Sequence, residues 1–308
     1  MAQRAQGRAR ALPGLPGRPL TAGTPDRLRK GPTAMLDYTG RTAVVTGFAS
    51  GIGARTASLL VGLGARVIGV DRPGAVAPAE LTALLAARID ADLSAPAGPA
   101  AVAERVDGPV HLLVNNAGVA ATRPWREVLG VDLLAPRDLT RLLAPKFADA
   151  AAVVTVASQA GLRWRETAAR SRALLAAETW GDAFALAADE PDIQRDCYAI
   201  AKEAVIVDAL TLAAERTVPG LRANTVSPGT VQTPLLADFR TAMGNEVVEG
   251  AAAWAGRHAT PDDIAAAIAF LGSDDAAWIS GVDLPVDGGY GALVFTMMQS
   301  AAAEEAAR

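Results

Sequence analysis

A glycine-rich turn near residue 50 constrains the fold more than any other feature of this sequence. The residues before it, 43–45, are apolar and predict a short buried strand, and Gly47, Gly51 and Gly53 follow at once. Glycines permit a tight turn and let the backbone approach a phosphate closely. The apolar segment after the turn, through Leu60, predicts a helix whose N-terminus would face that anion. The pattern therefore predicts a strand, a phosphate-binding turn and a helix.

The next predicted strand, residues 66–70, ends in Asp71, about twenty residues beyond the glycine turn. A carboxylate at this place can bind the two hydroxyl groups of a ribose, and it would repel a 2′-phosphate. Ser50 places no basic side chain in the turn. We therefore expect a dinucleotide site that prefers NAD. Arg72 keeps NADP open as the less favoured cofactor, because its guanidinium could bend back and hold a phosphate.

Strand-like and helix-like segments alternate along the rest of the chain. Short apolar runs predict further strands at 88–90, 110–114, 152–157, 221–226 and 282–286. Helical segments separate them, around 79–87, 100–106, 125–145 and 198–216. Such alternation is typical of a doubly wound parallel sheet whose ligand lies at the carboxyl ends of the strands. The span 235–258 is irregular and long for a compact domain, so we expect it to be a substrate lid.

A tyrosine and a lysine, Tyr198 and Lys202, stand four positions apart in one of the predicted helices. At this spacing both side chains share a face of the helix, so the ammonium can lie beneath the phenol. A cation beside a phenol favours the phenolate and lowers its pKa from the usual value of about 10. The pair could therefore serve as a general acid/base.

Composition limits the classes of function. The chain has 308 residues, 51% of them hydrophobic, which suits one large globular domain. Its net charge of −4 gives no global field to attract nucleic acid or an anionic membrane. A single cysteine, Cys197, forms no internal disulfide, and charged residues interrupt each apolar run before the roughly 18 residues that a membrane span needs. We expect a soluble, cytoplasmic protein without nucleic-acid or membrane partners. His111 and His258 lie in no metal-ligand motif, so no metal is expected.

The first 34 residues differ from the rest. They carry seven basic residues against one acidic residue and are rich in proline and glycine. Such a composition cannot bury enough apolar surface to fold by itself. We expect a disordered basic extension, with an organelle-targeting leader as the alternative. The folded domain is expected to span 35–291, followed by a C-terminal tail at 292–308.

Taken together, the ordered motifs of the chain resemble the short-chain dehydrogenase/reductase family. The resemblance covers about 36–289 and rests on Thr46-Gly47-x-x-x-Gly51-Ile52-Gly53, Asp92, Asn115-Asn116-Ala117-Gly118, Ser158, Tyr198-x-x-x-Lys202, Pro228-Gly229 with Thr233, and Asp287-Gly288-Gly289. It implies a single-domain Rossmann fold with a seven-stranded parallel sheet and helices on both faces. It also implies hydride transfer between a nicotinamide and a substrate carbinol or carbonyl carbon.

The resemblance also implies a role for each matching residue. Tyr198 would be the acid/base, Lys202 would lower its pKa and hold the nicotinamide ribose, and Ser158 would steady the substrate oxygen. The glycines would cradle the pyrophosphate, Asp71 would take the adenosine ribose and Asp92 the adenine. The full expected cofactor set is Gly47, Ser50, Gly51, Ile52, Gly53, Asp71, Asp92, Leu93, Asn115, Ala117, Gly118, Tyr198, Lys202, Pro228, Gly229, Val231 and Thr233. Within it, Asn115 would bind the cofactor backbone and Thr233 the carboxamide.

Two features depart from the family pattern. Asp132 stands where the family usually has an asparagine that holds a water for proton relay, so we count it with the catalytic residues and expect altered pH dependence. Ser158 and Tyr198 are 40 positions apart, against about a dozen in the family, so a helical insertion at about 163–192 must loop out and return. A similar insertion marks a bacterial subgroup that contains 3α-hydroxysteroid dehydrogenase/carbonyl reductase and coniferyl-alcohol dehydrogenases, and it implies a homodimer.

These features predict an NAD-dependent oxidoreductase that interconverts an alcohol and a carbonyl on a bulky hydrophobic or aromatic substrate. Two alternatives stay open at this point. One is an NADP-linked biosynthetic ketoreductase. The other is a catalytically weak NAD-binding regulator, which Asp132 would favour.

Overall fold

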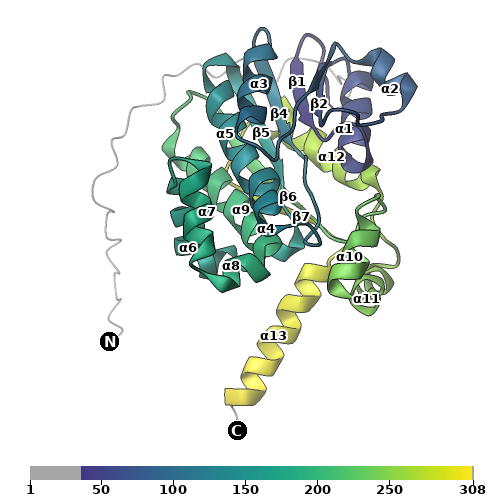
Figure 1. Ribbon diagram of the computed structural model, residues 1–308. Coiled ribbons are helices and arrows are strands. Elements are labelled where there is room, and N and C mark those ends of the chain that lie inside the picture. The colour runs from purple at the N-terminus through teal and green to yellow at the C-terminus, as the bar shows by residue number, and fades with distance from the viewer. Residues whose placement is uncertain (1–35, 307–308) are drawn as a thin grey trace, which may run out of the picture. The chain divides into compact units, whose positions relative to one another are not determined.

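Seven short segments form one parallel sheet with the strand order β3-β2-β1-β4-β5-β6-β7 (Figure 1). The structure is a computed structural model that describes residues 36–306, so the extension expected at 1–34 lies outside the described residues. The strands are β1 (Thr42–Thr46), β2 (Arg66–Asp71), β3 (Ala87–Asp90), β4 (Val110–Asn115), β5 (Phe147–Val156), β6 (Arg222–Pro228) and β7 (Asp283–Val286). This is the predicted fold class, and every predicted strand is present.

Helices connect the strands. Their bounds are α1 (Gly51–Gly62), α2 (Ala79–Leu84), α3 (Ala97–Arg105), α4 (Trp125–Leu129), α5 (Ala135–Leu143), α6 (Trp164–Ala176), α7 (Trp180–Ala188), α8 (Pro191–Arg195), α9 (Cys197–Glu215), α10 (Leu236–Met243), α11 (Asn245–Ala255), α12 (Pro261–Gly272) and α13 (Tyr290–Ala306). A π-helical turn, η2 (Gly130–Leu134), joins α4 to α5, and short 3₁₀ turns lie at η3 (Ala144–Lys146), η4 (Gln159–Gly161) and η5 (Asp274–Ala276).

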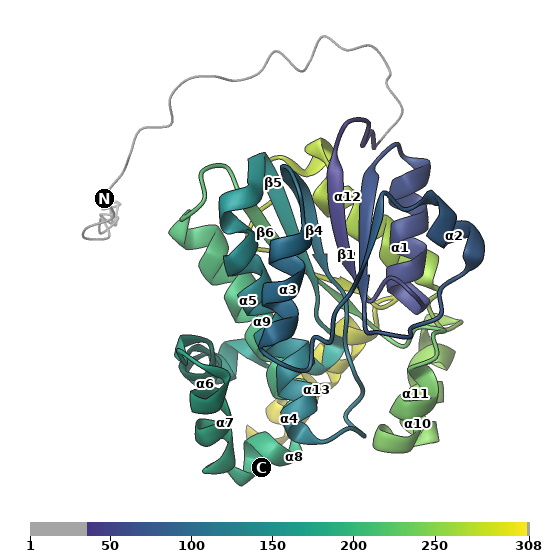
Figure 2. The ribbon, with the colours of Figure 1, turned by 45° about the horizontal axis from the view of Figure 1, so that its top comes forward.

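Two apolar cores form because successive side chains of a strand point to opposite faces of the sheet. On one face Val44 and Leu113 pack with apolar residues of α3, α5 and α9, whereas Val45 and Leu112 face the other core with α1 and α12 (Figure 2). The strand order reverses direction between β1 and β4, since β2 and β3 lie on one side and β5 to β7 on the other. In such sheets the ligand crevice opens at this switch point, outside the carboxyl ends of the strands.

The lid was expected to be irregular, and that prediction was wrong. Residues 235–258 contain α10 and α11, which are separated by Gly244 at a φ of +89°. Both helices are short and keep large apolar side chains in solvent, Met243 and Trp254 among them. Their apolar residues therefore show no sustained helical period.

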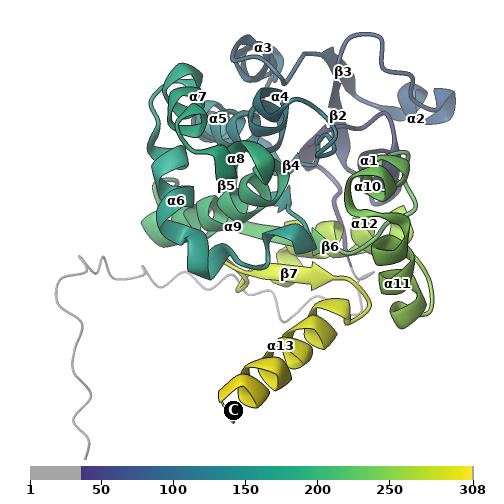
Figure 3. The same cartoon turned by 60° about the horizontal axis from the view of Figure 1, so that its bottom comes forward.

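The inserted segment forms α6, α7 and α8, as predicted. Figure 3 shows these three helices grouped beside α9, and α6 packs directly against it. Glu203 on α9 pairs with Arg170 on α6 at 3.2 Å, and the Glu203 side chain is only 5% exposed. The insertion therefore covers a face of α9 that the sheet does not, which explains why α9 is buried almost all round.

Candidate active site

A groove of about 980 Å³ opens at the carboxyl ends of the strands. Its walls come from the glycine turn, the ends of β2, β4, β5 and β6, and the start of α9 and α10. All but two of the predicted catalytic and cofactor residues line it. The two exceptions, Gly53 and Asn115, support the wall from behind.

The glycine turn is built so that no side chain could replace its glycines. Gly47 has a φ of +69°, and a Cβ on Gly53 would lie 2.0 Å from the Gly47 carbonyl oxygen. Ser50 precedes α1 without a side-chain cap, so backbone N–H groups of the first helical turn are free to bind an anion. These residues fit a dinucleotide pyrophosphate, the group that the sequence predicted here.

Asp71, at the end of β2, is hydrogen-bonded directly to that turn. One of its carboxylate oxygens accepts a hydrogen bond from the Ala49 N–H at 2.9 Å, and the other accepts from the Arg72 N–H at 2.9 Å. These contacts fix the carboxylate at the groove edge, where further lone pairs can accept from a ribose. Asp92 also lines the groove, and the N–H and hydroxyl of Ser94 lower its pKa by hydrogen bonding to the carboxylate.

Asn115 does not reach the groove. Its amide nitrogen donates to the Thr140 hydroxyl at 3.1 Å, and the side chain is buried inside the sheet layer. The role that the resemblance implied for Asn115 at the cofactor stays a prediction. Its neighbour Asn116 lines the groove instead and donates to the Thr46 carbonyl at 2.9 Å, which ties β4 to the glycine turn.

Ser158, Tyr198 and Lys202 meet in the groove although the insertion separates the first from the other two. Ser158 follows β5, and Tyr198 is the second residue of α9. The Lys202 ammonium lies 5.6 Å from the centre of the Tyr198 ring and donates to the Val156 carbonyl at 3.0 Å. Burial raises the pKa of Tyr198, and it outweighs the lowering by Lys202 and by a hydrogen bond with Ser158. The lysine therefore acts on the phenol in the predicted direction, but burial dominates.

Asp132 lies behind the lysine, on the π-helical turn η2. One carboxylate oxygen forms an ion pair with Lys202 Nζ at 2.9 Å, and the other accepts from the Val119 N–H at 3.0 Å. Gly118 leaves room for the carboxylate, because a Cβ there would lie 2.8 Å from it. Burial raises the pKa of Asp132, and this carboxylate holds the pKa of Lys202 above its ordinary value despite burial.

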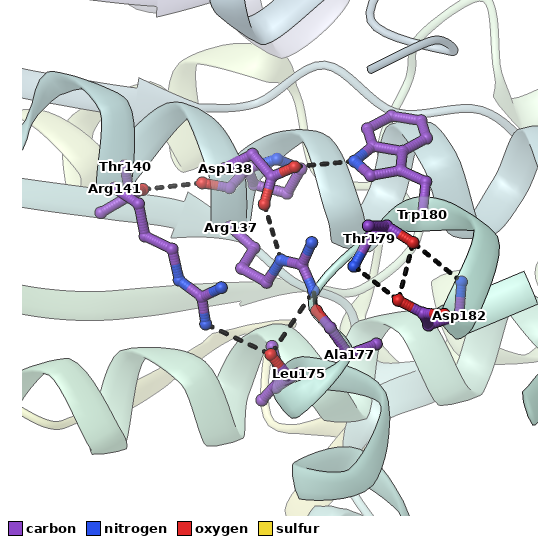
Figure 4. A network of polar contacts seen from close by, with 10 residues as sticks. Arg137, Asp138, Thr140, Arg141, Leu175, Ala177, Thr179, Trp180 and Asp182 are labelled. Carbon is purple, nitrogen blue, oxygen red and sulfur yellow. Dashed lines mark hydrogen bonds and ion pairs between the residues drawn. The ribbon is translucent and has the colours of Figure 1, made fainter.

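A network of buried polar contacts anchors the insertion to α5, and sequence reasoning did not anticipate it. The Arg137 side chain is only 1% exposed. Its guanidinium donates to the carbonyls of Leu175 and Ala177 at the end of α6 (Figure 4). The Trp180 indole donates to Asp138 at 2.7 Å, and Asp138 pairs with Arg137. These bonds fix the connection between α6 and α7 against α5. The earlier signal in the sequence was the adjacent Arg137-Asp138 pair, in a helix that also carries Thr140 and Arg141.

The lid contributes the aromatic residue nearest the tyrosine. The ring of Phe239, on α10, lies 5.4 Å from the ring of Tyr198 at an interplanar angle of 63°. Leu235 and Asp238 of the same segment also line the groove, as do Arg123 and Glu127 on the opposite wall. Trp164 and Trp254 do not line it.

Two family models and several known proteins are similar to this chain. Residues 41–170 match the family model described as short chain dehydrogenase, and residues 184–291 match the one described as enoyl-(acyl carrier protein) reductase. Over 261 residues the chain is 36% identical to a coniferyl-alcohol dehydrogenase of a Pseudomonas species, with 82% of this chain and 98% of that protein covered. The chain belongs to the short-chain dehydrogenase/reductase family.

Two further members place this short-chain dehydrogenase/reductase among its relatives. The crystal structure of a 3-alpha-hydroxysteroid dehydrogenase from Pseudomonas sp. B-0831, complexed with NADH, matches with a TM-score of 0.69 at 33% identity, covering 82% of this chain and 98% of that one. A 3-oxoacyl-[acyl-carrier-protein] reductase of Salmonella typhimurium is 28% identical, covering 82% and 98%. Both subgroup names that the insertion suggested therefore occur among the similar proteins.

None of the helices in residues 36–306 is long and apolar enough to cross a membrane. In the same part of the chain, no three His, Cys, Asp or Glu side chains gather in a way that could hold a metal ion.

Proposed function

We propose that this oxidoreductase is an NAD(H)-dependent alcohol dehydrogenase or carbonyl reductase for bulky hydrophobic or aromatic alcohols. The observation that carries the proposal is the meeting of Ser158, Tyr198 and Lys202 in a groove with a glycine-lined anion site. A bound nicotinamide cofactor would accept or supply the hydride. The names of a coniferyl-alcohol dehydrogenase and a 3-alpha-hydroxysteroid dehydrogenase among similar proteins support this substrate class.

The protein's own residues handle the proton. In alcohol oxidation Tyr198, as phenolate, takes the hydroxyl proton of the substrate, and in carbonyl reduction the neutral phenol returns it. Lys202 stabilises the phenolate by its charge, and Ser158 offers a hydroxyl that can hydrogen-bond to the substrate oxygen. The glycine turn and Asp71 would hold the two ends of the adenosine diphosphate. Pro228, Gly229, Val231 and Thr233 line the same groove, and Thr233 lies against Gly51 of the glycine turn.

The central test is to mix the purified protein with NAD and a panel of hydroxysteroids and aryl allylic alcohols and to follow absorbance of the reduced cofactor. Turnover of at least one panel member is expected. No signal from any alcohol, with NAD or NADP, would count against the proposal. NAD binding without Tyr198-dependent turnover would instead support a cofactor-binding regulator. The presence of Asp132, where the family usually has asparagine, favours that alternative.

The preference for NAD rests on Asp71, whose carboxylate is fixed at the groove edge. Replacing Asp71 with Ala or Asn is expected to lower the ratio of kcat/KM for NAD over NADP at least about tenfold, because the charge that repels a 2′-phosphate is gone. Asp107→Ala, an exposed acidic residue outside the groove, serves as the control. A wild type that prefers NADP would favour the biosynthetic ketoreductase instead, which the similarity to an acyl-carrier-protein reductase makes the second candidate.

We also propose a cytoplasmic homodimer in which α13 packs against a second copy. Apolar residues lie on all sides of this helix, which is typical of a buried helix, yet Phe295 and Met297 are each 62% exposed. The helix lies almost entirely beyond the family match, which ends at residue 291, and α11 is its main neighbour among the described residues. Most helical stability in proteins comes from tertiary packing of an apolar face, so a partner surface would stabilise this helix.

The double variant Phe295→Glu/Met297→Glu is expected to be a folded monomer, because both side chains are exposed in the single chain and only an interface would bury the new charges. Light scattering of the wild type should give the mass of two chains. Leu84→Glu, at an exposed apolar residue of α2, should leave the dimer intact. A monomeric wild type would end the dimer proposal.

A further inference from the structure

Phe239 occupies a place in the groove that no motif assigns. Its α10 helix carries the ring to 5.4 Å from the ring of Tyr198, close to edge-to-face geometry. Phe239 is half-buried, with one side toward the tyrosine and the groove. A substrate carbinol at the Tyr198 hydroxyl would therefore have this ring as a neighbouring apolar wall.

The lid that carries Phe239 is tied to the loop after β6. Arg240, the next residue, pairs with Glu249 of α11 at 2.7 Å. The second Glu249 oxygen lies 3.2 Å from His258 Nε2, and His258 Nδ1 lies 3.0 Å from the Thr230 hydroxyl. Thr230 sits between Gly229 and Val231, both of which line the groove. This chain of contacts connects the lid, at the residue after Phe239, with the loop that lines the groove.

The charges around the groove mouth limit what can enter. Arg123 and Glu127 neutralise one another at 3.0 Å on one wall, and Asp238 adds a carboxylate on the lid. Among the described residues that line the groove, Arg72 stands next to Asp71 at the dinucleotide end, whereas Arg123 and Lys202 already pair with carboxylates and so offer little to a carboxylate or phosphate on the substrate. A neutral substrate with an apolar ring fits this surface better than an acidic one.

We propose that Phe239 is the specificity-determining residue, and that it selects neutral alcohols with an aromatic ring close to the carbinol carbon over their ring-saturated analogues. The proposal rests on the alcohol dehydrogenase function and narrows its substrate class. Aromatic pairs gain stabilisation beyond that of equal apolar area, by an amount that corresponds to about a tenfold preference at most. A saturated ring of similar size keeps the apolar contact but loses this gain.

The test compares kcat/KM for cinnamyl alcohol and 3-cyclohexylprop-2-en-1-ol with NAD. Wild type is expected to prefer the aromatic alcohol by about five- to tenfold. Phe239→Leu keeps an apolar side chain without the ring, so the preference should fall to near one, mainly through KM for the aromatic substrate. Phe239→Tyr keeps the ring and should keep the preference. Met243→Leu, exposed on the same helix, is the matched control.

The outcomes distinguish failure of the proposed role of Phe239 from failure of the proposed dehydrogenase function. Equal efficiency of the wild type for both alcohols, or an unchanged ratio in Phe239→Leu, overturns the role of Phe239 and leaves the dehydrogenase function standing. Wild type that oxidises neither of these nor any other alcohol, with either cofactor, overturns both. NAD affinity, followed by fluorescence of the bound reduced cofactor, should be the same in all variants, which shows that the cofactor loop is intact.

Discussion

Replacing Tyr198 with Phe is expected to reduce kcat about 10³-fold while the affinity for NAD stays unchanged. The substitution removes only the hydroxyl that exchanges the substrate proton, and a positioned acid/base contributes roughly 10²- to 10⁴-fold to rate. The ring and its packing against Phe239 are kept, so the lid and the groove wall should hold their positions. Steady-state kinetics with the best panel alcohol, together with a binding titration of reduced cofactor, measure both quantities.

The pH profile of the wild type gives an independent check on the same residue. Burial raises the pKa of Tyr198, and alcohol oxidation needs the deprotonated phenol. Oxidation should therefore increase with pH through the alkaline range, whereas carbonyl reduction, which needs the neutral phenol, should fall there. The Tyr198→Phe variant should lose this pH dependence of turnover together with most of the rate. Turnover within tenfold of wild type in Tyr198→Phe would show that another group transfers the proton.

The strands of the sheet could be predicted from the sequence because they stand out as short apolar runs between predicted helices. Such a pattern is local, so it can be recognised without knowing the contacts that each strand makes. The meeting of Ser158 and Tyr198 was also predictable, since both had to reach one substrate oxygen. The path of the intervening segment was not. It depends on Arg137, a charged residue that is buried because two carbonyls and Asp138 satisfy its guanidinium. A single sequence gives no sign that a particular arginine will find such partners.

The lid shows a second limit. Phe239 lies about forty positions from Tyr198 in the sequence, and neither motif nor periodicity connects them. Their contact follows from the fold, because β6 ends beside the start of α9 and the chain then crosses over the groove as α10. For Asp132, unlike Phe239, the sequence did indicate an unusual residue, but it did not give that residue's contacts. Its identity stood out from the family pattern, but only the structure shows an ion pair with Lys202 at one carboxylate oxygen and a hydrogen bond from the Val119 N–H at the other.

The ion pair with Lys202 and the Val119 hydrogen bond predict that loss of Asp132 destabilises the fold. Asp132→Ala leaves the Lys202 ammonium, 6% exposed, without its counter-ion. Removing one partner of a buried ion pair costs about 3–5 kcal/mol, which corresponds to a fall in Tm of about 10 °C for a domain of this size. Asp132→Asn should lose less, since its amide oxygen can still accept from one donor, although its NH₂ then faces the other. Thermal unfolding measures both, with exposed Asp189→Asn as the control.

The same substitutions separate stability from chemistry. The negative charge of Asp132 raises the pKa of Tyr198, so Asp132→Asn removes an opposing influence and lets Lys202 favour the phenolate more strongly. The alkaline rise of alcohol oxidation should move to lower pH, and turnover near pH 7 should equal or exceed that of the wild type even though Tm is lower. An inert wild type beside an active Asp132→Asn would mean that the carboxylate has silenced the site. A variant whose pH profile matches the wild type would mean that Asp132 only holds Lys202 in place, and that its charge does not reach the tyrosine.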